Sequence, residues 1–255
     1  MSGYGRFAEF YDRLTQNVRY DLIADAAVRY LERFGGRRNI VLDLACGTGS
    51  LCEQLARRGF DVIGADASDG MLSAALDKKF DSGLPIQYLR QEMTELDMFG
   101  TIDLTLCTLD SINHLPDKAA VQKTFERVSL FAYPDGMFIF DVNTLHKHRD
   151  ILAQNAFTYD LEDIFCAWQN QYDPADGSVD IFLDIFEQLP DGSYGRISES
   201  FTERIWSDSE ITEMLRAAGM TVLARYDDYT DKPVTDATER IVYVAKKLTD
   251  QPEDS

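Results

Sequence analysis

The spacing of apolar side chains at the start of the chain predicts two helices. Four residues recur there at the i, i+3, i+4, i+7 spacing of one helix face: Phe7, Phe10, Tyr11 and Leu14. A second segment, residues 22–34, contains no glycine or proline and ends at Gly35-Gly36, which is typical of a helix C-terminus. We therefore predict a helical cap over residues 1–37.

The next part of the chain, residues 38–156, alternates between short apolar runs and helical periodicity. The apolar runs predict strands at 40–44, 62–66, 86–89, 102–107 and 137–142. Helical segments lie at 51–58, 68–80 and 121–131, and the predicted buried face of the second consists of Met71, Leu72, Ala75 and Leu76. Pro134-Asp135-Gly136 predicts a turn before the last strand. This alternation predicts a parallel sheet with right-handed crossovers.

Residues 157–206 change to long runs rich in aromatic and β-branched residues. These runs cover 165–169, 178–186 and 197–206, with turn residues between them at 174–177 and 190–193. They predict a three-stranded antiparallel insertion. A helix at 209–218 and strands at 221–226 and 240–245 then resume the α/β pattern over 207–248. We therefore predict one α/β core that is interrupted by a β lid.

Composition narrows the range of partners. The net charge is −19, from 25 basic and 44 acidic residues, and basic residues occur in short pairs such as Arg37-Arg38 and Arg57-Arg58. Proteins that bind nucleic acids usually present clustered basic side chains, so this chain disfavours such a partner, although a basic pocket formed in three dimensions leaves an RNA acceptor open. No apolar run approaches the ~18 to 20 residues of a membrane helix. Met1–Asp12 shows no signal-peptide pattern, and we expect a cytoplasmic protein without membrane contact.

The cysteines predict no metal site. Cys46, Cys52, Cys107 and Cys166 form no CxxC pair and no Cys/His spacing suited to zinc. Three of them lie in or beside predicted core segments, where a reduced cysteine behaves as a small apolar side chain. We expect all four to be structural.

A glycine-rich turn joins the predicted strand 40–44 to the helix 51–58. Gly47 and Gly49 have no Cβ, so backbone N–H groups and the helix N-terminus can come close to a ligand. By itself this pattern also fits an ordinary tight turn. The dinucleotide-binding fingerprint needs a third glycine at position 52, which is Cys52, and this disfavours a nicotinamide-dependent oxidoreductase.

Two acidic residues add chemistry to this turn. Asp43 lies inside the strand before Gly47, where a carboxylate suits a ligand that carries an ammonium and a sulfonium better than a phosphate. Asp66 ends the second strand, at the edge where open α/β sheets bind ligands. Its carboxylate can accept hydrogen bonds from both hydroxyls of a ribose, each contributing about 1.5 to 3 kcal/mol. A simple helix-entry role for Asp66 is the alternative.

Several motifs together resemble one enzyme family. The segment 41–49, Val-Leu-Asp-Leu-Ala-Cys-Gly-Thr-Gly, resembles motif I of the class I S-adenosylmethionine-dependent methyltransferases, and 64–68 followed by Met71-Leu72 is similar to their motif II. The resemblance extends to 7–12, 108–115 and 239–242, and so to nearly the full chain. As a whole the chain resembles the YqeM-like bacterial methyltransferases.

The resemblance implies a fold and a cofactor. The fold is a Rossmann-like seven-stranded sheet in the order 3-2-1-4-5-7-6 with strand 7 antiparallel, and the antiparallel lid follows strand 5. The cofactor is S-adenosylmethionine, with the loop 45–49 under its methionine part and Asp66 on its ribose. Relatives carry Asp-Met after strand 3, whereas this chain has Glu92-Met93, so the contact of the carboxylate with the adenine stays open.

The same resemblance implies the remaining cofactor contacts. Ala67 and Met71 would flank the adenine, Thr108 and Leu109 would face the cofactor, and Tyr11 would close over it. The complete implied set is Tyr11, Asp43, Ala45, Gly47, Thr48, Gly49, Asp66, Ala67, Met71, Glu92, Met93, Thr108 and Leu109.

Methyl transfer is an in-line displacement, so alignment of acceptor and methyl group does most of the catalytic work, up to ~7 to 11 kcal/mol. A general base adds ~10² to 10⁴-fold when the acceptor must lose a proton. Asn113 and His114 follow strand 4 near the expected methyl position and are the catalytic candidates. An imidazole, with an ordinary pKa of about 6.5, suits a base, and the alternative for His114 is a structural hydrogen bond.

Other residues near the predicted cleft are candidates for shaping the acceptor site. Asp141 and Asn143 end strand 5, with helix entry or turn formation as an equal alternative. On the lid, half of the side chains of each strand face away from the cleft, which leaves open the facing of four candidates: Trp168, Tyr172, Phe201 and Arg204. We expect His146 and His148 to be surface loop residues.

These observations predict a methyltransferase that acts on the nitrogen or oxygen nucleophile of a small molecule. A methyltransferase acting on RNA, such as tRNA, and a sensor that binds S-adenosylmethionine without turnover are the alternatives. The sequence specifies neither the acceptor nor the oligomeric state.

Overall fold

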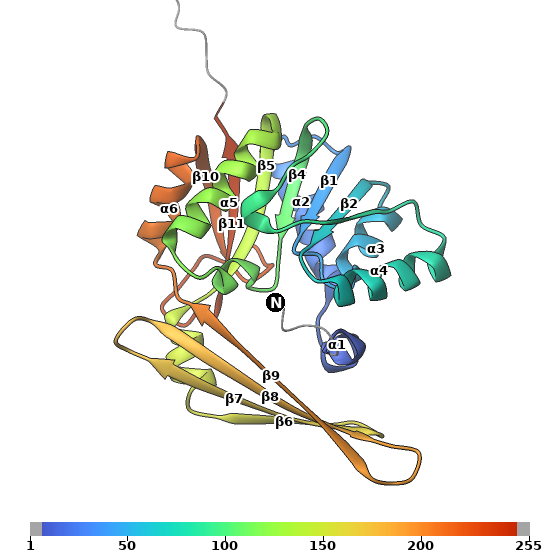
Figure 1. The fold of residues 1–255 in the computed structure, drawn as a ribbon. Coiled ribbons are helices and arrows are strands. Elements are labelled where there is room, and N and C mark those ends of the chain that lie inside the picture. The colour runs from blue at the N-terminus through green and yellow to red at the C-terminus, as the bar shows by residue number, and fades with distance from the viewer. Residues whose placement is uncertain (1–6, 249–255) are drawn as a thin grey trace, which may run out of the picture.

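The computed structural model describes residues 7–248, which form two sheets (Figure 1). The larger sheet has seven strands in the order β10-β11-β5-β4-β1-β2-β3, and β11 is antiparallel to both of its neighbours. Its strands are β1 (Ile40–Leu44), β2 (Asp61–Asp66), β3 (Gln87–Arg90), β4 (Ile102–Cys107), β5 (Ala132–Asn143), β10 (Met220–Asp227) and β11 (Arg240–Lys247). The predicted strand order and the antiparallel seventh strand are confirmed.

Helices cover both faces of this sheet. They are α2 (Tyr20–Phe34), α3 (Ser50–Arg57), α4 (Asp69–Ser82), α5 (Lys118–Phe131) and α6 (Asp208–Ala217), whereas α1 (Ala8–Leu14) packs against the lid. Alternate residues of β5 supply the two cores: Phe138 packs with α5 and α6, whereas Ile139 packs with α2 and α3. Both faces of β5 are therefore buried, which is why its sequence is a continuous apolar run rather than an alternating one.

The second sheet is the lid, with the antiparallel order β6-β7-β8-β9. Its strands are β6 (Ala156–Asp160), β7 (Ile164–Asp173), β8 (Ser178–Gln188) and β9 (Tyr194–Arg204). The prediction of three strands was wrong, because β6 is a short edge strand whose side chains are exposed or only partly buried and which carries little apolar signal. Phe10 and Leu14 of α1 pack against lid residues such as Ile181, so α1 links the lid to the core.

Two local expectations are also corrected. Leu76 was expected to be buried but is 50% exposed, because α4 covers the end of the sheet beside β3 and buries only a narrow stripe: Met71, Leu72 and Ala75. The expected turn at 134–136 lies within β5, where it is an irregularity in the pairing with β4, and Asp135 has φ +67°. A turn sequence can be accommodated inside a strand as a bulge that re-aims the chain.

Three short helices complete the described chain: η1 (Met93–Glu95), η2 (Ser111–His114) and η3 (His146–Leu152). The last is a π-helix that connects the core to the lid. Within residues 7–248, every helix is too short or too polar to cross a membrane.

Candidate active site

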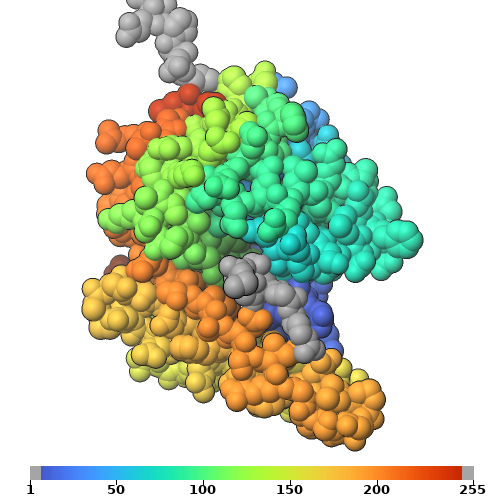
Figure 2. All heavy atoms as spheres, viewed as in Figure 1, coloured from blue at the N-terminus to red at the C-terminus, as the bar shows by residue number. Residues whose placement is uncertain are grey.

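A cavity of about 720 Å³ lies between the carboxyl ends of the core strands and the lid. In the space-filling view the lid, in yellow and orange, lies against the core below these strand ends (Figure 2). Strands β1 and β2 pair in parallel with Leu44 opposite Ala65, so the residues that follow them reach the same edge of the sheet. The cavity is therefore at the edge where open α/β sheets bind ligands.

Most of the predicted cofactor-binding residues line this cavity: Tyr11, Asp43, Ala45, Gly47, Asp66, Ala67, Met71, Glu92, Met93, Thr108 and Leu109. Thr48 and Gly49 stand outside the lining. Thr48 is turned away because its hydroxyl donates a hydrogen bond to Asp12 (2.6 Å) and accepts one from Lys78 (3.0 Å). Gly49 is held against the ring of Tyr88, since a Cβ on Gly49 would lie 2.2 Å from the tyrosine hydroxyl.

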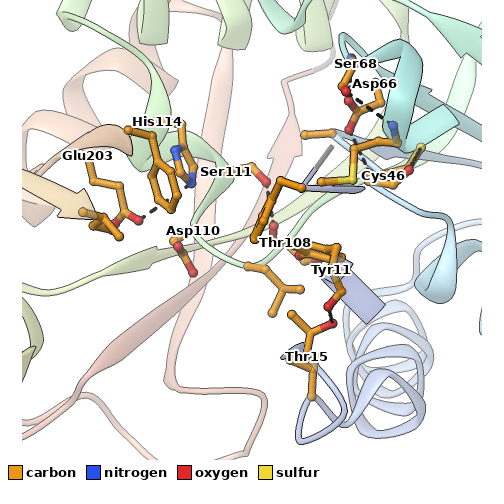
Figure 3. A pocket seen from close by; sticks show the side chains of 18 of the residues that line it. Tyr11, Thr15, Cys46, Asp66, Ser68, Thr108, Asp110, Ser111, His114 and Glu203 are labelled. Carbon is orange, nitrogen blue, oxygen red and sulfur yellow. Dashed lines mark hydrogen bonds and ion pairs between the residues drawn. The ribbon is translucent and has the colours of Figure 1, made fainter. Parts of the chain in front are cut away.

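The loop after β1 is held by Asp66. The carboxylate of Asp66 accepts hydrogen bonds from the backbone N–H groups of Gly47 and Ser68, both at 2.8 Å (Figure 3). Burial raises the pKa of Asp66. The carboxylate of Asp43 is more deeply buried, burial raises its pKa to about 7, and it accepts a hydrogen bond from the thiol of Cys52 (3.1 Å).

The loop after β4 has an unusual backbone. Leu109 and Asp110 both have positive φ values, 56° and 55°, which side-chain-bearing residues rarely adopt. Asp141, at the end of β5, accepts the N–H of Leu109 (2.8 Å) and of Asp110 (2.7 Å), which stabilises this conformation. Asp141 is itself fully buried, and the guanidinium of Arg240 pairs with it. Although burial opposes ionisation, Arg240 also holds the pKa of Asp110 well below its usual range.

The opposite side of the cavity carries His114. Its Nε2 lies 3.7 Å from Oε1 of Glu203 on β9, and its ring centroid lies 5.1 Å from that of Phe201. Asn113, the second catalytic candidate, is fully buried and stands outside the lining. Its side chain donates a hydrogen bond to the carbonyl of Arg204 and accepts one from the N–H of Asn143, so it joins the lid to the core.

Phe201 and Arg204 lie on opposite faces of β9, whereas Trp168 and Tyr172 share one face of β7 and differ in their position along that strand. Trp168 and Phe201 line the cavity, whereas Tyr172 and Arg204 do not. Arg204 instead donates to the carbonyl of Pro116 and pairs with Asp176.

His148 corrects the prediction of a surface position. It is fully buried, with Nε2 3.1 Å from Oε2 of Glu203. The π-helical turn of η3 brings His148 and Lys147 to this site, and π-turns are frequent at functional sites. Lys147 lines the cavity, donates to the side-chain oxygen of Asn143 (2.8 Å), and has a pKa lowered by burial.

The sequence and the fold of this chain are similar to those of known methyltransferases. A family described as a methyltransferase domain matches residues 41–136. The chain is 33% identical over 245 residues to the methyltransferase YqeM of Bacillus subtilis strain 168, which covers 96% of this chain and 97% of that protein. A solved S-adenosylmethionine-dependent methyltransferase from Clostridium acetobutylicum has a TM-score of 0.86 at 32% identity, covering 97% of this chain and 100% of that one.

The chain belongs to the YqeM-like class I methyltransferases. An amino pentose methyltransferase from Micromonospora echinaspora, solved with S-adenosylmethionine bound, shares the fold with a TM-score of 0.75 at 18% identity, covering 93% of this chain and 96% of that one. Membership of this family, with the similarity to the S-adenosylmethionine-dependent enzyme from Clostridium acetobutylicum, makes S-adenosylmethionine the cofactor. When bound it supplies an activated methyl group.

The residues of the YqeM-like methyltransferase fit this cofactor. The sulfonium and ammonium groups are cationic, and the buried carboxylates of Asp43 and Asp66 would be stabilised by a nearby cation. A Cβ built on Gly47 would have nothing within 4 Å, which leaves open space for a ligand beside the loop.

The sequence did not identify four charged residues of the cavity lining as site residues: Asp110, Lys147, Glu203 and Arg240. Arg240 lies within a segment that carries the family resemblance, which was its available signal. Glu203 looked like a polar residue of an alternating strand, and nothing in its neighbourhood marks it as buried.

Proposed function

We propose that this methyltransferase transfers a methyl group to the nitrogen or oxygen nucleophile of a small molecule held between the core and the lid. The observation that carries the proposal is a single cavity that extends from Gly47 and Asp66 to Trp168 and Phe201 on the lid. Its volume of about 720 Å³ lies within the range of small-molecule sites, ~300 to 1,000 Å³. The space is thus continuous from the cofactor residues to the proposed acceptor site.

The proposed roles of the cofactor residues are those that the family resemblance implies, and their place in the cavity lining supports them. The Gly47 loop and Asp43 would contact the methionine part of the cofactor, Asp66 the ribose, and Met93 the adenine. His114, on the acceptor side, is the proposed proton acceptor. In this proposal the lid over 157–206 closes the acceptor side, between the core segments 38–156 and 207–248. Of the cap expected over 1–37, residues 1–6 lie outside the described residues, and 7–37 form the described part.

The chemistry of the walls supports an organic acceptor of modest size. Lid side chains such as Ile181, Leu183 and Trp168 give the acceptor side an apolar surface. The amino pentose methyltransferase acts, by its name, on a sugar, and its similarity to this chain extends through 93% of the residues. Both observations favour a small molecule over a polymer.

An RNA acceptor has less support. The net charge is −19, and the cavity is lined by carboxylates including Asp66, Glu92 and Asp110. Phosphate contacts dominate the affinity of most nucleic-acid complexes, so a fluorescence titration with tRNA at low salt tests this alternative directly. Absence of tRNA affinity is expected.

Calorimetry tests the proposal in two steps. We expect S-adenosylmethionine and S-adenosylhomocysteine to bind with micromolar affinity, and NAD to show no binding. A screen of small amines and alcohols, read by S-adenosylhomocysteine release, then tests turnover. Binding of the cofactor without turnover of any acceptor would favour a sensor, and absence of cofactor binding would refute the proposed site.

A further inference from the structure

Glu203 is a buried carboxylate at the junction of lid and core. Glu203 is only 2% exposed, yet it lines the cavity. Its contacts are the Nε2 atoms of His148 (3.1 Å) and His114 (3.7 Å) and the side-chain amide of Asn143 (3.4 Å). Among residues 7–248, no lysine or arginine lies within ion-pair distance of it. Its direct partners are therefore two imidazoles and an amide, and Lys147 acts on it only from a longer distance. A buried carboxylate without a directly paired ammonium or guanidinium is costly, and a bound cationic group would stabilise it.

The neighbouring carboxylate of Asp110, unlike that of Glu203, already has a cationic partner. Asp110 is paired with Arg240, with Nη2 2.7 Å from Oδ1. The ligand atoms of Asp110, His114 and Glu203 all lie within 4.8 Å of one another. Figure 3 shows these three side chains together on one side of the pocket, across from Asp66 and Cys46. A small cation that enters between them would meet two carboxylates and one imidazole.

We propose that Glu203 recognises an amine as the methyl acceptor, in its ammonium form, and that His114 takes the proton that the amine must lose. This inference rests on the proposed function. The ammonium releases one proton to Nε2 of His114, which leaves a nitrogen lone pair. The lone pair forms the N–C bond to the methyl group while the C–S bond breaks and its electron pair stays on sulfur. The positive charge thereby moves from sulfur to the acceptor nitrogen, beside Glu203.

The direction of this charge movement favours an amine over a hydroxyl. A carboxylate next to the nitrogen stabilises the positive charge that develops there during transfer. A hydroxyl acceptor would develop negative charge at the same place, where Glu203 and Asp110 would repel it. Phe201, on the same face of β9 as Glu203, and Trp168, further along the lid, both line the cavity and suit the hydrocarbon part of such an amine.

A divalent metal ion is the competing occupant of the three side chains. Arg240 already neutralises part of the acidic charge at Asp110, and the side chain of Lys147 lines the same cavity. These positive groups disfavour a doubly charged ion more than a singly charged ammonium. An organic cation is therefore the occupant that these side chains favour.

A matched pair of probes tests the inference. With the protein saturated by S-adenosylhomocysteine, the affinities of 2-phenylethylamine and 2-phenylethanol are measured by ligand-observed NMR. We expect the amine to bind at least about tenfold more tightly, as a charge-assisted hydrogen bond implies. Glu203→Gln should lose this preference while S-adenosylhomocysteine binding stays unchanged. Glu199→Gln is the control, because Glu199 lies on the same face of β9 but outside the cavity lining.

The outcomes separate the two proposals. Normal S-adenosylhomocysteine binding with equal affinity for amine and alcohol, or no binding of the amine, would overturn the amine assignment alone. Binding of magnesium or manganese that Glu203→Gln abolishes would overturn it in favour of a metal site. Failure of S-adenosylhomocysteine to bind would refute the proposed function first. If Glu203→Gln does not fold, the affinities of 2-phenylethylamine and 2-phenylethanol for the unchanged protein still test whether the site prefers an amine.

Discussion

The carboxylate of Asp141, at the end of β5, accepts the backbone N–H of Leu109 at 2.8 Å and so connects two neighbouring strand ends. The same carboxylate pairs with Arg240 from β11 and accepts a hydrogen bond from the hydroxyl of Tyr229. The loop that lines the middle of the cavity therefore depends on one buried acidic group. Residues in such sparsely populated backbone conformations persist only when their surroundings hold them in place.

Removing the carboxylate of Asp141 should lower the stability of the protein and its affinity for S-adenosylhomocysteine. We expect Asp141→Ala to lower the free energy of unfolding by about 3 to 5 kcal/mol, because Arg240 loses a buried partner. Urea denaturation measures this change, and calorimetry should show weaker S-adenosylhomocysteine binding. Asp25→Ala is the control, since Asp25 makes an exposed ion pair with Arg58 whose loss should cost less than about 1 kcal/mol. Equal effects of the two substitutions would contradict the role of Asp141.

Asp66→Ala should abolish cofactor binding and leave the fold intact. The substitution removes the acceptor for the N–H groups of Gly47 and Ser68 as well as the proposed ribose contact. Each charge-assisted hydrogen bond contributes about 1.5 to 3 kcal/mol, so the affinity should fall by about tenfold or more per bond. Circular dichroism checks the fold, and Asp61→Ala, at the exposed start of the same strand, is the matched control. Unchanged affinity for S-adenosylmethionine would remove the ribose assignment.

The two glycines of the loop should respond differently to alanine. Gly47 has φ +53° and open space beside it, so Gly47→Ala should cost roughly 1 to 2 kcal/mol of stability but block cofactor binding. Gly49 has φ +77°, and a Cβ there would meet the hydroxyl of Tyr88. Gly49→Ala should therefore lower the stability by about 1 to 3 kcal/mol more than Gly47→Ala does, because the added methyl group overpacks the site.

Thermal unfolding and calorimetry of the two glycine variants separate these effects. Adding Tyr88→Phe to Gly49→Ala should recover part of the stability, because it removes the nearest clashing atom. If Gly47→Ala bound S-adenosylhomocysteine as tightly as the unchanged protein, Gly47 would not approach the cofactor.

Asp43 should make the stability of the unliganded protein depend on pH. Burial raises its pKa from 3.8 to about 7. Over this interval the folded protein keeps a proton that the unfolded chain has released, so the stabilising contribution is complete below pH 3.8 and is lost as the pH rises to about 7. One pKa unit corresponds to about 1.4 kcal/mol, and the full effect is about 4 kcal/mol.

The comparison with Asp43→Asn isolates this group, because all other titrating residues are shared. Urea denaturation of both proteins across this pH range should show that the difference in unfolding free energy changes in favour of Asp43→Asn as the pH rises. Parallel pH profiles of the two proteins would contradict the raised pKa of Asp43.

The sequence by itself determined the architecture and the cofactor half of the site. The alternation of apolar runs and helices specifies a parallel α/β sheet, because only that arrangement buries both faces of such strands. Gly47 and Asp66 lie at the ends of consecutive parallel strands, so their proximity follows from the local β-α-β connection. The alternating runs after β5 likewise marked the lid, although the weak pattern of Ala156–Asp160 concealed its fourth strand.

Only the tertiary structure decided the acceptor half. His114, His148 and Glu203 come from three separate elements, and their meeting depends on how the lid docks on the core. His148 was expected in a surface loop, and no feature of the sequence distinguishes Glu203 from a solvent-facing polar residue of a strand. The contact between η3 and β9 buries both side chains. The physical reason is that local periodicity specifies which face of an element is apolar, whereas the burial of a polar side chain depends on the partner that packs against it.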